Sequence, residues 1–148
     1  MAYRALENSD RDSAQKHFYH ILLRLTAPDS KNDKSPLLVA ATLELSNLNF
    51  ILGKGFKEIM PFFNASIKTA RHLGDKRSHA MLKLHLGRLY YFSNQRQKAM
   101  TAFEEGKACV EELGDDDITV QASELIGLYF YIQGLFREAV EYFEIAVE

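Results

Sequence analysis

The stretch that decides the fold is residues 73–92, which read LGDKRSHAMLKLHLGRLYYF. It returns 40 positions later, at residues 113–132, as LGDDDITVQASELIGLYFYI. The same offset continues beyond this stretch, where Phe103 returns as Phe143. A fixed period of this length indicates a stack of supersecondary units, each of which buries its apolar face against its neighbours. Such arrays mostly bind other molecules, so the period favours a binding role.

The apolar residues within one period recur with helical spacing. Ala80, Leu84, Gly87 and Tyr91 follow i, i+4, i+7, i+11 spacing, which is typical of an amphipathic helix. A polar break follows, and a second amphipathic run ends at Gly114, because glycine readily takes the positive φ that closes a helix. The same pattern predicts further helices at 36–52, 56–73, 118–133 and 136–148, and a polar loop at 28–35.

The small and large residues of these helices resemble the tetratricopeptide repeat (TPR) family, whose units are pairs of antiparallel helices. The first helix of such a unit carries Leu-Gly and an aromatic residue, and the second carries Ala, an aromatic residue and a small residue. One copy of this pattern is formed by Leu86, Gly87, Tyr90, Ala99, Phe103 and Gly106, the next by Ile126, Gly127, Phe130, Ala139, Phe143 and Ala146, and a degenerate copy by Asn47, Phe50, Ile59, Phe63 and Ser66.

The resemblance implies an all-α fold: a right-handed superhelical solenoid of about three repeats plus a partial N-terminal unit, in a single domain over 1–148. The implied segments are a partial unit at 1–27, a degenerate repeat at 36–74, a repeat at 77–114 and a truncated repeat at 117–148. The 40-residue period is longer than the usual 34, and in this it resembles the helical repeat region of MalT-type bacterial regulators. Because the last residues stay apolar, we expect the chain to be a fragment of a larger protein.

In TPR arrays the first helices line a concave groove, so the resemblance implies where a partner binds. The implied groove residues are Glu44, Leu48, Met81, His85, Arg88, Tyr91, Gln121, Glu124, Leu128 and Tyr131. They suit an extended peptide or helix with apolar anchors, and Arg88 is expected to pair with an acidic group on it. Leu45, Leu84 and Leu125 lie among them, and these leucines are alternatively explained as packing between units.

We therefore expect a non-catalytic protein-interaction module, a TPR scaffold that binds a peptide or partner protein in its groove. The alternative is a regulatory or sensor segment of a multidomain bacterial transcription regulator or signalling ATPase. No enzyme motif, cofactor or metal is expected. Gly53-Lys54-Gly55 lacks the spacing of a phosphate-binding loop, and His17 and His20, three residues apart, are explained better as solvated residues than as zinc ligands.

Composition indicates the cellular compartment and the classes of partner that we expect for this chain. The single cysteine, Cys109, fits a reducing compartment, and the start of the chain lacks the apolar run of a signal peptide, so we expect a cytoplasmic protein that does not enter membranes. Residues 1–88 carry a net charge of +6 and residues 89–148 a net charge of −8. A modest basic cluster is formed by Lys68, Arg71, Lys76, Arg77 and Lys83, but we do not expect nucleic-acid binding. The apolar terminal helix could pair two chains into a homodimer.

Overall fold

Every regular element in the described part of the chain is helical. The computed structural model describes residues 2–28 and 36–147, which confirms the prediction of an all-α protein for those residues. The predicted loop at 28–35 falls almost wholly on residues outside the described ranges. The chain divides into two compact units, Met1–Leu73 and Gly74–Glu148. The division falls at the first Leu-Gly-Asp of the sequence repeat.

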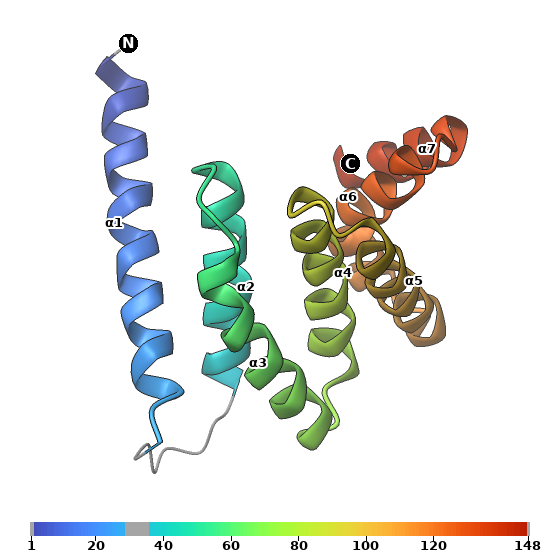
Figure 1. Cartoon of the computed structure of the whole chain (residues 1–148). Coiled ribbons are helices and arrows are strands. Elements are labelled where there is room, and N and C mark those ends of the chain that lie inside the picture. The colour runs from blue at the N-terminus through green and yellow to red at the C-terminus, as the bar shows by residue number, and fades with distance from the viewer. Residues whose placement is uncertain (1, 29–35, 148) are drawn as a thin grey trace. The chain divides into compact units, whose positions relative to one another are not determined.

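The first unit contains α1 (Ala2–Leu25), α2 (Pro36–Ile51), the 3-10 turn η1 (Lys57–Ile59) and α3 (Met60–His72). Helix α2 packs against both α1 and α3 (Figure 1). The prediction of a helix at 56–73 was wrong at its start, since α3 begins at Met60. Pro61 lies in the first turn of α3, where its missing N–H costs no hydrogen bond. The largest fully buried side chains of this unit include Leu22, Leu38, Leu45 and Phe63.

Polar contacts also tie the first unit together. Gln15 of α1 donates from Nε2 to Oδ1 of Asn49 on α2 over 3.0 Å, and both side chains are buried. Lys54, in the turn after α2, donates to Gln15 Oε1 over 3.1 Å and pairs with Asp12. The hydrogen bond from Lys54 lowers the pKa of Asp12. The Gly53-Lys54-Gly55 segment thus makes a turn whose lysine binds helix α1.

The second unit contains α4 (Lys76–Phe92), α5 (Arg96–Leu113), α6 (Asp116–Ile132) and α7 (Phe136–Val147). Helix α4 packs on α5, and α6 packs on α7 and also against α4 and α5 (Figure 1). Both α4 and α6 begin with an aspartate cap. Asp75 accepts a hydrogen bond from the Ser78 N–H, and Asp115 accepts one from the Asp117 N–H. These caps satisfy N–H groups that the first turn of a helix leaves unpaired.

Close helix contacts explain two glycines of the second unit that lie within helices. A Cβ atom on Gly87 of α4 would lie 2.7–2.9 Å from ring atoms of Phe103 on α5. Forty residues later, a Cβ atom on Gly127 of α6 would lie 2.6–3.1 Å from ring atoms of Phe143 on α7. Each aromatic ring therefore packs directly on the backbone of the facing helix. The small-residue positions of the sequence repeat are sites of close approach.

The turns that end α2, α4 and α6 share one hydrogen-bond pattern. Lys54 N–H donates to Asn49 O, Gln95 N–H to Tyr90 O and Leu135 N–H to Phe130 O. The residue before each donor has positive φ: Gly53 (63°), Asn94 (58°) and Gly134 (79°). This six-residue closure is the Schellman motif, which pairs carbonyls at a helix end. The same local chemistry thus ends three helices of the chain.

Candidate functional site

The candidate site is the surface formed by α4 and α6 within the second unit, here named the α4/α6 surface. Its residues are Met81, His85, Arg88 and Tyr91 of α4, with Gln121, Glu124, Leu128 and Tyr131 of α6. The other two predicted groove residues, Glu44 and Leu48, lie on α2 in the first unit, where Glu44 is exposed and Leu48 is half-buried. Eight of the ten predicted residues thus lie on α4 and α6.

The centre of the α4/α6 surface is a buried pair of polar side chains. His85 and Arg88 are only 4% and 5% exposed, and Arg88 Nη2 donates to His85 Nδ1 over 3.2 Å. Burial, with a smaller effect of the Arg88 charge, lowers the pKa of His85 to about 3. A neutral ring that accepts at Nδ1 carries its proton on Nε2. His85 is thus an uncharged acceptor that helps to fix the guanidinium.

Arg88 also interacts electrostatically with a residue of α6. Burial lowers its pKa, and the negative charge of Glu124 raises it, which places this carboxylate within electrostatic range of the guanidinium. Glu124 itself is exposed. The expectation that Arg88 meets an acidic group on a ligand does not suit a side chain that is 5% exposed. Glu124 is the residue that presents charge to the outside here.

The remaining residues give this surface an apolar border. Met81, Tyr91 and Leu128 are half-buried and pack against the core of the second unit. Tyr131 is 55% exposed, and its ring meets that of Phe136 edge to face at 5.6 Å. The leucines Leu84 and Leu125, which lie among these residues in the sequence, are buried in the core. Packing therefore accounts for the leucines, whereas Tyr131, Gln121 and Glu124 remain open to a partner.

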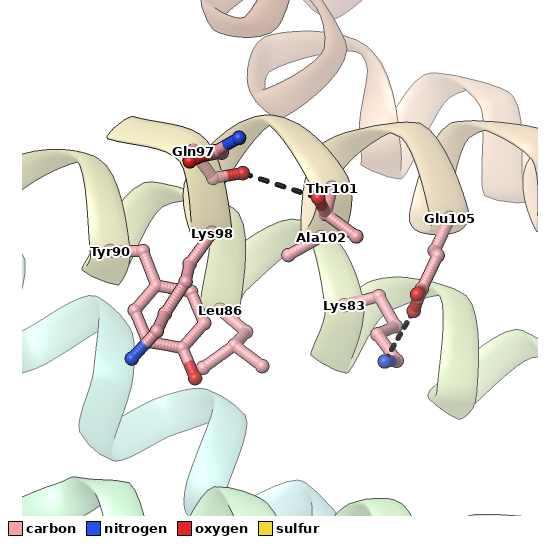
Figure 2. A pocket seen from close by; sticks show the side chains of 8 residues that line it. All are labelled: Lys83, Leu86, Tyr90, Gln97, Lys98, Thr101, Ala102 and Glu105. Carbon is pink, nitrogen blue, oxygen red and sulfur yellow. Dashed lines mark hydrogen bonds and ion pairs between the residues drawn. The ribbon is translucent and has the colours of Figure 1, made fainter. Parts of the chain in front are cut away.

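A second hollow lies between α4 and α5, and sequence reasoning missed it. It encloses about 390 Å³ and is lined by Lys83, Leu86, Tyr90, Gln97, Lys98, Thr101, Ala102 and Glu105 (Figure 2). Lys83 pairs with Glu105, and the Lys98 ammonium lies 5.6 Å from the centre of the Tyr90 ring. Its lysines thus already have partners within the hollow. The i, i+7 spacing of Lys83 and Tyr90 indicates that they share one face of a helix, but no signal in the sequence marks a hollow there, because its other wall comes from α5.

Ion pairs also account for most of the predicted basic cluster. Lys76 pairs with Glu112 over 2.7 Å, Arg77 with Asp115, and Lys83 with Glu105. The hydrogen bond with Glu112 raises the pKa of Lys76. Cations and anions that the sequence places in oppositely charged halves are therefore neighbours in the second unit.

The other chemical candidates are ordinary surface groups. His17 and His20 are exposed on α1, as predicted, and His17 Nδ1 contacts the Ser13 carbonyl at 2.7 Å. Cys109 is a free thiol, half-buried beside the core of the second unit. Across residues 2–28 and 36–147, no group of three or more His, Cys, Asp or Glu side chains is arranged to hold a metal ion.

Comparisons with protein-family models and with curated proteins give no match. None of the helices in the described ranges combines the length and apolar character needed to cross a membrane. The α4/α6 surface must therefore be interpreted from its own chemistry.

Proposed function

We propose that this chain is a non-catalytic interaction module that binds a peptide segment of a partner protein on its α4/α6 surface. The observation that carries the proposal is a fixed polar centre, the His85–Arg88 pair, bordered by accessible side chains on two adjacent helices. In this proposal the helix pairs belong to a right-handed, TPR-like solenoid. The 40-residue offset between the starts of α4 and α6, and of α5 and α7, supports that architecture.

The accessible groups suggest the chemistry of the peptide. Tyr131 offers an aromatic ring and a hydroxyl, a combination that is common among residues that dominate binding energy. Gln121 can donate and accept hydrogen bonds along an extended backbone. Glu124 favours a lysine or arginine on the peptide, because its carboxylate is exposed whereas Arg88 is buried and presents little positive charge. The proposed ligand is thus an apolar peptide with one basic side chain.

Selection from a library of random peptides displayed on phage, followed by calorimetry, tests this proposal. We expect the selected peptides to combine apolar residues with a lysine or arginine. Tyr131→Ala and Glu124→Lys should each weaken binding by about tenfold, the range expected of residues that dominate an interface. Glu138→Lys is the matched control, because Glu138 is exposed on α7, outside the surface, and carries the same charge.

The effects of the three variants distinguish binding at the α4/α6 surface from binding elsewhere. Peptides that lose affinity with Tyr131→Ala and Glu124→Lys but not with Glu138→Lys would support the α4/α6 surface as the binding site. If binders lose affinity equally with all three variants, or if none of the three changes binding, then the surface is not the site.

A further inference from the structure

The outer face of α7 is an apolar stripe that is largely open to solvent. Phe136, Val140 and Val147 are 61%, 53% and 84% exposed. With Phe143, which is half-buried because its ring packs on Gly127 of α6, they recur at intervals of four, three and four residues, which places them along one side of the helix, at the edge of its contact with α6. Exposed apolar side chains gathered on one face mark interaction sites more often than scattered ones do.

The chain itself contains a helix that covers the corresponding face. The positions of α5 that lie forty residues before the stripe are occupied by Arg96, Met100, Phe103 and Lys107. Helix α6 packs against α5. Phe103 meets the Tyr129 ring at 5.7 Å, and Lys107 lies 5.7 Å from the centre of the Phe130 ring. Four of the seven buried residues of α6, namely Ile118, Ala122, Leu125 and Tyr129, have the same four, three, four spacing. A helix is therefore the element that fits such a stripe.

Two substitutions within the repeat alter the chemistry of the α7 stripe. Arg96 donates to the Ile132 carbonyl over 3.2 Å, and Lys107 contacts an aromatic ring, so both cations serve the contact with α6. At the equivalent positions of α7, Phe136 replaces Arg96 and Val147 replaces Lys107. The stripe is apolar from end to end, and a partner must match it with apolar residues along its full length.

The border of the stripe is acidic. Beside the stripe lie three exposed charged residues, Arg137, Glu141 and Glu144. Arg137 pairs with Glu141 over 3.8 Å, so the negative charge of Glu144 is the one that this pair does not balance. A second copy of this chain would bring a border of the same net charge, −1 over Arg137, Glu141 and Glu144, to the contact, which disfavours pairing of two copies. A helix flanked by lysine or arginine would gain from the same charges.

We infer that the outer face of α7 docks a basic amphipathic helix of a partner protein. The partner helix has apolar residues at intervals of four, three and four, flanked by lysine or arginine. Its apolar side covers Phe136, Val140 and Val147, and its cations lie beside Glu141 and Glu144. Phe136, at one end of this stripe, meets Tyr131 of the α4/α6 surface. The two proposals are therefore tested at residues away from that contact, Glu124 for the α4/α6 surface and Val140 and Val147 for the α7 stripe.

A synthetic peptide with the sequence pattern of α6 provides the probe. Residues 116–133 are synthesised with D116K, D117K, Q121K and E124K, which keeps the apolar side of α6 and makes the remainder basic. The unaltered peptide, with its acidic residues, is the comparison. Fluorescence anisotropy against the 148-residue chain should give a dissociation constant about tenfold lower for the basic peptide, and added salt should shrink the difference.

Paired valine substitutions locate the binding face. Val140→Glu should weaken binding of the basic peptide by about tenfold. Val120→Glu is the matched control, since Val120 is 49% exposed on α6 and lies off the stripe. Val147→Glu repeats the test at a more exposed residue, and circular dichroism checks that each variant folds.

Three results would overturn the inference. One is binding that Val140→Glu and Val147→Glu leave unchanged, and another is equal affinity for the basic and acidic peptides at low salt. The third is self-association in sedimentation velocity that Val140→Glu abolishes, since a second copy would then occupy the face.

Discussion

Replacing Gly87 by alanine tests whether α4 and α5 are held by contact between a backbone and a ring. The added Cβ would lie 2.7 Å from Phe103 Cγ, the ring atom nearest its own backbone, and Phe103 is fully buried. Because neither group can move away cheaply, we expect an overpacking cost of up to about 3 kcal/mol. Alanine also favours a helix over glycine by about 1 kcal/mol. The net loss in the free energy of unfolding is therefore up to about 2 kcal/mol.

Gly127→Ala is the matched control within the same unit. Its added Cβ would meet the outer edge of the Phe143 ring, and Phe143 is only half-buried, so the ring can shift toward solvent. We expect Gly127→Ala to cost less than Gly87→Ala, and the helical preference of alanine offsets part of that smaller cost.

Hydrogen–deuterium exchange with mass spectrometry is the appropriate assay, because a chain of two compact units need not unfold in one step. Protection of amides in α4 and α5 reports the free energy of opening in that region. Combining Gly87→Ala with Phe103→Leu should recover part of the loss. The reasoning fails if Gly87→Ala keeps wild-type protection, or if the two substitutions act additively.

Three further changes test the turns, the caps and the buried histidine. Asn94→Ala should cost about 1 kcal/mol in thermal unfolding because φ is positive there, whereas Asn94→Gly should cost nothing; equal losses would contradict this. Asp115→Ala should cost about 1 kcal/mol and Asp115→Asn much less, since asparagine can still accept from the Asp117 N–H; equal stability of all three proteins in urea would exclude the cap. The pKa of His85 is about 3 in the folded protein, against an ordinary value of 6.5. As the pH is lowered below 6.5, the unfolded chain therefore binds a proton at His85 before the folded chain does, and the free energy of unfolding decreases. Between pH 7 and pH 5 the wild type should lose about 2 kcal/mol more than His85→Gln in urea titrations, and parallel curves would refute a buried neutral ring.

The helices of this chain were largely predictable because their ends depend on local chemistry. A left-handed Gly114 ends α5, and the Asp115 that follows caps α6, so the break at Leu-Gly-Asp could be recognised from the sequence alone. Gly87 and Phe103 were predictable for a related reason. A small residue that recurs with a large one at the repeat period indicates two helices in close contact.

The parts that could not be predicted depend on partners far apart in the sequence. Nothing in the local pattern links Gln15 to Asn49, 34 residues later, yet they form one buried hydrogen bond. The late start of α3 depends on Pro61 and a preceding 3-10 turn, which the apolar spacing does not reveal. For the candidate site, the resemblance to TPR proteins implied that Arg88 lies in one groove with residues of α6. The burial of Arg88 was not evident, although His85 at i−3 was a local indication of its hydrogen bond.

The shared turn chemistry has a consequence for how such a chain can change length. The segment from Asp75 to Gly114 begins with a capping aspartate and ends with a left-handed glycine, and Asp115 then caps the next helix in the same way. Duplication or loss of a 40-codon stretch of the gene would therefore join ends that already form a working turn. Such an event would add or remove one whole helix pair of this chain.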